Sequence, residues 1–342
     1  MRKLIEKLSS LRGISGRETR VGEETAAILS PYCDSVGIDP LGSVIAYRGC
    51  GLKGAPSVLI EAHIDEIGLM VSSVCENGAL RFVNVGGVDE RILPSLEVTV
   101  HGAEDIPGII GFMPAELTDA SKSYKLSELV IDTGLKAERV RELVKTGDFV
   151  TLPQSVGALG KHQISSKTMD DRASLAALIS VMKRIRNEKL CCDVYLSAAV
   201  QEEVGCRGGK TSSYAVMPDM AVAVDVTHGI TPDNDRNAFK TGAGAVISKG
   251  PNLHPRLTDR LIKTARANGI KYCVDVDGGN TGTDAWEIQV AGAGIPAALL
   301  SIPLKYMHTS VETLDVRDVK AVAELLASFI KGLGSDTSWL SL

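Results

Sequence analysis

The sequence predicts an α/β fold in which a mixed, largely parallel sheet is flanked by helices and carries an inserted, small β-rich domain. Apolar runs of strand length, such as Met220–Val224, alternate with helical patterns, which is typical of parallel strands covered on both faces. Between residues 70 and 163 this alternation gives way to short strands separated by turn residues. The 342 residues are also long for one core. We therefore expect a discontinuous main domain, 1–69 and 164–342, and an inserted β-barrel-like domain, 70–163.

The first part of the chain is expected to form two helices and a hairpin. Leucines recur on one helical face within residues 4–11, and a second helix is expected over Val21–Leu29. Ser15 is the predicted N-cap of this second helix. The segment Asp34–Tyr47 alternates like a hairpin around the turn Asp39–Gly42.

The next elements surround the inserted segment. Ser57–His63 reads as an apolar strand that ends at a histidine, and one helix is expected in the insertion near Ala137–Val144. After the insertion, Ala173–Ile185 has the pattern of an amphipathic helix, with Asp170 and Asp171 at its start. A carboxylate at that position can cap free N–H groups. Helix capping accounts for the presence of one aspartate at this position but not for the second.

The second half of the chain predicts a continued alternation of strands and helices. The expected strands are Cys192–Gln201, Met220–Asp225, Phe239–Ser248, Tyr272–Val276 and Pro296–Ile302. The expected helices are Gly208–Val216, Leu257–Asn268, Ala285–Val290 and Val316–Leu333. The Gly-rich loop at residues 278–284 lacks the spacing of a phosphate-binding loop. No nucleotide site is therefore expected.

Residues of types that can bind metals follow several of the predicted strands. They are His63, the pair Glu202 and Glu203, Asp225 and His308, with Asp170 at the start of a helix. Parallel strands of an open sheet present their carboxyl ends at one edge, where such sheets bind ligands. Neighbouring strand residues point to opposite sides, so one glutamate could bind a metal while the other moves a proton. The alternative is a pair of solvated glutamates at a strand exit.

This inventory of two imidazoles and several carboxylates is that of a two-metal hydrolase. Nitrogen and oxygen ligands without thiolate suit Zn²⁺ or Co²⁺, with Mn²⁺ as a third choice. Three ligand carboxylates and one hydroxide would balance the charge of two divalent ions. Such ions, roughly 3.5–4 Å apart, can supply a hydroxide at neutral pH and polarise a carbonyl group.

Composition excludes several other classes of protein. A net charge of -5 argues against a nucleic-acid partner or an anionic membrane surface. No apolar run approaches the roughly 18 residues of a membrane helix, and the N-terminus lacks a signal-peptide pattern. The seven cysteines include no CxxC pair and are expected to be reduced. The cytoplasm is therefore the expected compartment.

Five motifs in this order resemble peptidase family forty-two of the dinuclear metallopeptidases. These are cytosolic aminopeptidases that include glutamyl aminopeptidases and tetrahedral, dodecameric enzymes, some of which carry the older label endoglucanase. The resemblance covers nearly the whole chain. The motifs are Ala62–Gly68, Met169–Arg172, Gln201–Gly205, Val224–Thr227 and Ile302–Thr309.

The resemblance implies a role for each candidate residue. Glu202 would be the general base, and Asp65 would orient His63. The insertion would be a dimerisation domain, and dimers would assemble into a dodecamer that acts on peptides with a free N-terminus. The implied metal ligands are His63 and Asp225 for one ion, Glu203 and His308 for the other, and Asp170 bridging both.

A deacylase or carboxypeptidase with a similar metal site is the alternative. Such an enzyme needs a cation to hold the substrate carboxylate, and Arg172 is the arginine within the ligand motifs. A carbohydrate hydrolase is excluded, because only 4% of the residues are aromatic and the carboxylates accompany histidines.

Four further residues bear on the substrate pocket. An acidic side-chain preference would need a cation there, for which Lys305 and Arg207 are the candidates. Cys206 is expected near the metals but not as a nucleophile. His228 is expected to be structural or to lie on the surface, and the alternative is that it lines the pocket.

Overall fold

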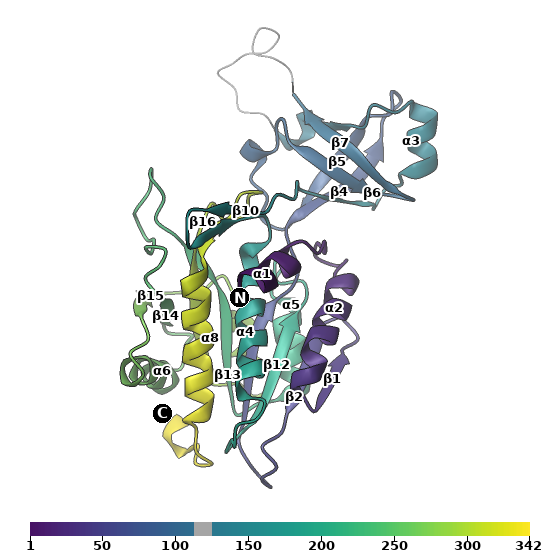
Figure 1. Ribbon diagram of the computed structural model, residues 1–342. Helices are drawn as coiled ribbons and strands as arrows, with labels where there is room; N and C mark the ends of the chain where they lie inside the picture. Colours follow the sequence, from purple (N-terminus) through teal and green to yellow (C-terminus); the bar gives the residue numbers. More distant parts are fainter. Residues whose placement is uncertain (113–124) are drawn as a thin grey trace.

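The computed structural model describes residues 1–112 and 125–342, and these form a large mixed sheet and a small closed barrel (Figure 1). The large sheet has eleven strands. Its main path is β1 (Ser35–Ile38), β2 (Val44–Arg48), β12 (Asp193–Ala199), β3 (Ser57–His63), β13 (Met220–His228), β16 (Ala297–Lys305), β17 (Thr313–Asp315), β11 (Gln163–Ser165) and β10 (Gly157–Leu159). Off this path, β14 (Ala245–Lys249) pairs with β16 and with β15 (Tyr272–Val276).

The centre of this sheet is parallel. Strands β12, β3, β13 and β16 pair in parallel, whereas the edge strands β1, β2, β17, β11 and β10 are antiparallel. The central strands are almost wholly buried, which explains their continuous apolar runs. The predicted mixed α/β fold is confirmed.

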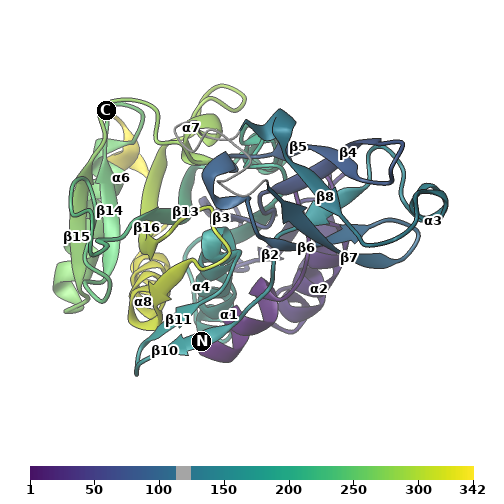
Figure 2. The same ribbon diagram turned by 90° about the horizontal axis from the view of Figure 1, so that it is seen from above.

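Helices cover both faces of the sheet, as Figure 2 shows from above. One face carries α1 (Arg2–Ser9), α2 (Thr19–Leu29), α4 (Met169–Ile185), α6 (Pro255–Ala267) and α8 (Val316–Lys331), and the other carries α5 (Arg207–Val216) and α7 (Ala285–Ile288). Strand β3 serves both cores, because Val58, Ile60 and Ala62 join the first and Leu59 joins the second. Among the described residues, none of the helices is long and apolar enough to cross a membrane.

The inserted unit is an antiparallel barrel with its own hydrophobic core. In order around the barrel, its strands are β4 (Gly68–Val74), β5 (Leu80–Val85), β8 (Val130–Asp132), β7 (Asp105–Gly111), β6 (Glu97–His101) and β9 (Phe149–Thr151). Helix α3 (Ala137–Leu143) lies within this segment, as predicted. Strands β10 and β11, which follow the barrel in sequence, pair with the large sheet instead.

Two local predictions are wrong. Ser15 does not cap α2, because its hydroxyl donates a 2.6 Å hydrogen bond to Asp65. The strand expected over Phe239–Ser248 begins only at Ala245. The N–H groups of Gly242 and Gly244, both in the left-handed region, donate to Asp318 instead of to a neighbouring strand.

Candidate metal centre

The carboxyl ends of the parallel strands meet at one edge of the large sheet, above a cavity of about 890 Å³. His63 is the last residue of β3, and Asp225 lies within β13. The other ligand candidates come from segments beside these strand ends. Five of the predicted site residues line the cavity: Asp170, Glu202, Glu203, Asp225 and His308.

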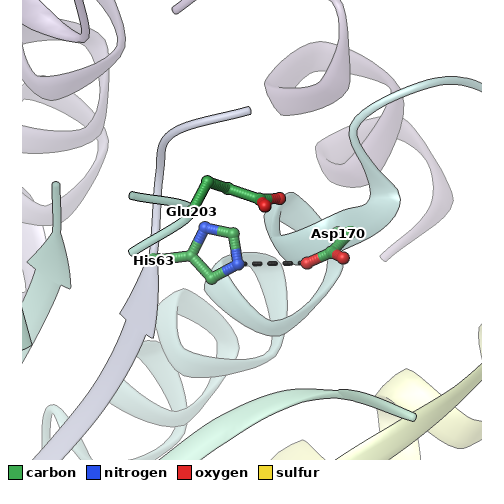
Figure 3. A group of neighbouring side chains, drawn as sticks. All are labelled: His63, Asp170 and Glu203. Carbon is green, nitrogen blue, oxygen red and sulfur yellow. Dashed lines mark hydrogen bonds and ion pairs between the residues drawn. The ribbon is translucent and has the colours of Figure 1, made fainter. Parts of the chain in front are cut away.

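Asp170 lies between two histidines and uses a different oxygen toward each. Its Oδ1 is 3.0 Å from Nε2 of His63, and its Oδ2 is 3.3 Å from Nε2 of His308. Oε1 of Glu203 is also 3.3 Å from Nε2 of His308. Figure 3 shows His63, Asp170 and Glu203 converging, and one ligand atom of each lies within 4.8 Å of the others. A carboxylate shared in this way is suited to bridging two cations.

A second group of ligand atoms shares the same histidine. One atom each of His63, Asp171 and Asp225 lies within 4.8 Å of the others, and all three residues are buried. The structure thus brings together all five predicted ligands and adds Asp171. Neither aspartate acts as the predicted helix cap, because no capping hydrogen bond is made at the start of α4.

Both histidines are held with Nε2 toward the carboxylates. Nδ1 of His63 is 3.4 Å from Oδ1 of Asp65, and Nδ1 of His308 donates to the carbonyl oxygen of Gly87 at 2.9 Å. A partner on one ring nitrogen fixes the tautomer and leaves the other nitrogen free for a metal. Gly87 belongs to the inserted segment, so the barrel unit contributes directly to this site.

Asp65 contacts other segments of the site besides His63. It accepts hydrogen bonds from the backbone N–H groups of Glu202 at 3.0 Å and Glu203 at 3.2 Å, as well as from the Ser15 hydroxyl. One buried carboxylate therefore positions a predicted ligand on β3 and both glutamates beyond β12. The sequence predicted only its contact with His63.

Glu312 is a site residue that the sequence analysis missed. Its Oε2 accepts the N–H groups of Met169 at 2.7 Å and Asp170 at 3.1 Å, and its Oε1 accepts that of His308 at 2.9 Å. This buried carboxylate thus fixes the backbone of two predicted ligands. A glutamate four residues after His308 was the only signal for this role in the sequence.

Glu202, the predicted general base, lies close to His63. Burial raises its pKa to about 9, with His63 opposing and Asp225 adding to the rise. Its Oε2 is 4.0 Å from Nε2 of His63, and Cys206 donates to its Oε1 at 3.2 Å. Burial also raises the pKa of the Cys206 thiol, so a reactive thiolate is disfavoured, as predicted.

The electrostatics of the site favour cations. Burial opposes charging of His308, but its contacts with Asp170 and Glu203 outweigh burial and raise its pKa to about 11. Burial likewise opposes charging of His63, and its interactions with Asp170 and Asp65 raise its pKa well above the usual value. Protons on the imidazoles thus compensate the carboxylates. Because divalent cations could replace those protons, the donor set fits metal ions.

Among the described residues, no Lys or Arg lines the wall of the cavity. His228 and Cys206 line it, whereas Lys305 and Arg207 do not, and His228 is exposed as expected. The acidic side chains away from the ligands are Asp275, Asp277 and Glu287. Part of this wall comes from the Gly-rich loop at residues 278–284, of which residues 280–283 line the cavity.

Arg172 lies in the interior of the protein. It is completely buried, and its guanidinium donates to the carbonyl oxygens of Ile64, Leu8 and Leu11. The arginine that the alternative activity would require is therefore not available to a substrate carboxylate.

A mixed α/β sheet with a cluster of histidines and carboxylates at its carboxyl edge is typical of a metal-dependent hydrolase. A family model described as M42 glutamyl aminopeptidase matches residues 42–325. The chain belongs to this family and is a peptide hydrolase of the aminopeptidase class.

Individual relatives match over nearly their whole length. The lysyl aminopeptidase of Pyrococcus furiosus is 32% identical over 96% of this chain and 96% of its own. The solved aminopeptidase APDkam598 of Desulfurococcus kamchatkensis is 36% identical, with a TM-score of 0.92, over 99% of this chain and 96% of that one. The TET1 peptidase of Pyrococcus horikoshii, described as assembling into a tetrahedron or an octahedral shell, is 31% identical with a TM-score of 0.87 over 97% and 99%.

Proposed function

We propose that this chain removes single residues from peptide N-termini with two divalent metal ions per subunit. The observation that carries the proposal is Asp170, whose two oxygens face two different histidines. We assign Asp170 as the bridging ligand. The terminal ligands are His63 and Asp225 for one ion and Glu203 and His308 for the other.

The chemistry divides between the ions and Glu202. When bound, two such ions activate water and polarise the scissile carbonyl group. Glu202 accepts a proton from the attacking water on its carboxylate and delivers it to the leaving amine. Asp65 keeps Glu202 in place through the backbone and orients His63. The ligand set of nitrogen and oxygen atoms supports Zn²⁺ or Co²⁺, with Mn²⁺ as a third possibility.

Two features favour an aminopeptidase over the deacylase or carboxypeptidase alternative. Arg172 is buried and bound to backbone carbonyl groups, and none of the described lining residues is Lys or Arg. A free carboxylate of the substrate would therefore lack a cationic partner. A positively charged amino terminus would instead meet an acidic cavity.

Metal removal tests this proposal. We expect exhaustive chelation to abolish hydrolysis of aminoacyl-p-nitroanilides, and Zn²⁺ or Co²⁺ to restore it at close to two ions per subunit. N-acetyl amino acids measured in parallel should not be cleaved. Full activity in a metal-free preparation would refute the proposal.

The inserted unit, expected at residues 70–163, is our candidate for subunit contact. It supplies none of the proposed ligand side chains, and the TET1 relative assembles into closed shells. Large side chains on its surface, including Val83 and Ile109, are about half exposed. We propose that the barrel mediates dimerisation and that dimers assemble into a dodecamer.

A further inference from the structure

Asp171 is a buried carboxylate that the proposed mechanism does not use. It follows the bridging candidate Asp170 directly and is completely inaccessible to solvent. Neither of its oxygens has a hydrogen-bond partner among the described residues. A buried carboxylate is costly unless it is hydrogen-bonded, protonated or close to a cation. Either a proton or a cation is therefore expected to compensate it.

The neighbouring polypeptide provides only part of that compensation, because His63 and Arg172 interact favourably with the charge of Asp171 but donate no hydrogen bond to it. The hydroxyl of Ser174 is close enough to favour the charged form, but it does not reach hydrogen-bonding geometry. Arg172, the next residue, donates to the carbonyl oxygens of Ile64, Leu8 and Leu11. Asp225 and Asp170 are near and carry charge of the same sign.

The position of Asp171 points to a cation. One of its oxygens lies within 4.8 Å of ligand atoms of both His63 and Asp225, which are the proposed terminal ligands of one metal. A structural cap would instead accept an N–H group at the start of α4, and none does so. The shared position is an observation separate from the burial and the unpartnered oxygens.

We propose that Asp171 is a further anionic residue of the metal centre, which strengthens binding of the ion held by His63 and Asp225. The inference rests on the proposed two-metal function. It makes the two sites unequal, because the ion near His63 then faces one carboxylate more than the ion near His308. We therefore expect a tight and a weaker site in each subunit.

Metal titration of Asp171→Asn tests the inference. The variant keeps the shape of the side chain and removes its charge. We expect Zn²⁺ affinity at the tight site to fall roughly 10–100-fold, a range found when groups supporting a metal are removed, while the weaker site changes little. Equilibrium dialysis against a chelator of known affinity, with metal analysis, measures both constants. Ser174→Ala is the matched control and should bind both ions like the wild type.

Thermal melting gives a second readout that does not depend on activity. In the metal-free state, Asp171→Asn should melt no lower than the wild type, because it removes an uncompensated buried charge. Saturating Zn²⁺ should raise its melting temperature less than that of the wild type. A purely structural role predicts the opposite pattern, with a lower metal-free melting temperature and an unchanged shift on adding Zn²⁺.

The outcomes separate this inference from the proposed function. A wild type that binds two ions and an Asp171→Asn variant that binds both with unchanged affinity would overturn the inference alone. A wild type that binds no ion would overturn both. If Asp171→Asn does not fold, Asp171→Ser, which is smaller and uncharged, allows the same comparison.

Discussion

Some carboxylates of the candidate metal centre are proposed ligands, and others hold the ligands in place. The sequence alone identifies the first kind better than the second. Those that follow a strand or open a helix, such as Glu203 and Asp170, could be identified because several predicted strands end in ligand-type residues at once. Glu312 and the backbone contacts of Asp65 could not, because they depend on how distant segments approach one another. Ligands follow local patterns, whereas the groups that hold them depend on tertiary packing.

The adjacent glutamates provide the sharpest test of residue roles. Glu202→Gln keeps its shape but cannot accept a proton, so kcat should fall about 10²–10⁴-fold with KM and metal content little changed. Glu203→Gln replaces an anionic ligand by a weak neutral one, so one ion should bind more loosely. Its activity should partly recover as Zn²⁺ or Co²⁺ is raised, and that of Glu202→Gln should not.

Metal analysis of both variants, with activity measured across a metal series, distinguishes the two roles. The assignment would have to be reversed if Glu202→Gln lost an ion while Glu203→Gln retained both.

Glu312→Gln should weaken the centre without touching a proposed ligand side chain. The carboxylate accepts N–H groups through both oxygens, and an amide can accept through only one. Either the link to Asp170 or the link to His308 is therefore lost. We expect metal affinity to fall roughly 10–100-fold.

Chelator competition measures this affinity, and the exposed Glu324→Gln on α8 serves as a control. Unchanged metal affinity in Glu312→Gln would show that these backbone contacts do not support the ligands.

At the scale of elements, apolar runs predicted the buried strands well. Strand β3 has the predicted boundaries, because burial on both faces leaves a continuous apolar signature. Strand β15 also has the predicted boundaries, although it is a partly exposed strand that, among the described strands, pairs only with β14. The prediction failed at Phe239–Ala243, where glycine N–H groups bind a distant aspartate on α8. It failed at Ser15 for the same reason, since that hydroxyl serves Asp65 rather than the adjacent helix.

The loops around β15 and α7 should determine which side chains the cavity accepts. Asp275, Asp277 and Glu287 line it, and of these Glu287 pairs with Lys210 at 2.6 Å. Among the described residues, no Lys or Arg lines the cavity. Because like charges placed together are unfavourable, kcat/KM for a Glu-p-nitroanilide should be at least about tenfold below that for the isosteric Gln compound. Parallel kinetics on the two substrates check this, and Asp277→Asn should narrow the difference. Faster cleavage of the Glu compound would contradict the expectation.

At the scale of the whole molecule, the sequence predicted an inserted unit because the alternation of strands and helices gives way to short strands separated by turn residues. Closure of the barrel depends on long-range pairing, including that of β4 with β9, which the local pattern does not contain. The contact of this unit with the candidate metal centre through Gly87 was likewise not predictable. It is made by a backbone carbonyl group, which every residue type has.

The proposed assembly predicts that the intact protein is an oligomer by light scattering. Ile109 on β7 is 55% exposed, and a charge placed in an apolar contact between subunits should disrupt it. We therefore expect Ile109→Asp to form smaller particles while its melting temperature stays close to that of the wild type.

Leu52→Asp, at 52% exposure on the main unit, is the control. A strictly monomeric wild type would exclude the dodecamer, and an Ile109→Asp variant of full size would place the contact elsewhere.

The hydrogen bond from His308 to Gly87 joins a proposed metal ligand to the inserted barrel. If His308 binds an ion as proposed, that ion would favour the imidazole orientation that this carbonyl selects, and the ion and the contact with the barrel would stabilise each other. Thermodynamic reciprocity then requires that any influence of the ion on docking be matched by an equal influence of docking on ion affinity. A partner that holds the barrel in its docked position would therefore also tighten the hold on the ion, without contacting it.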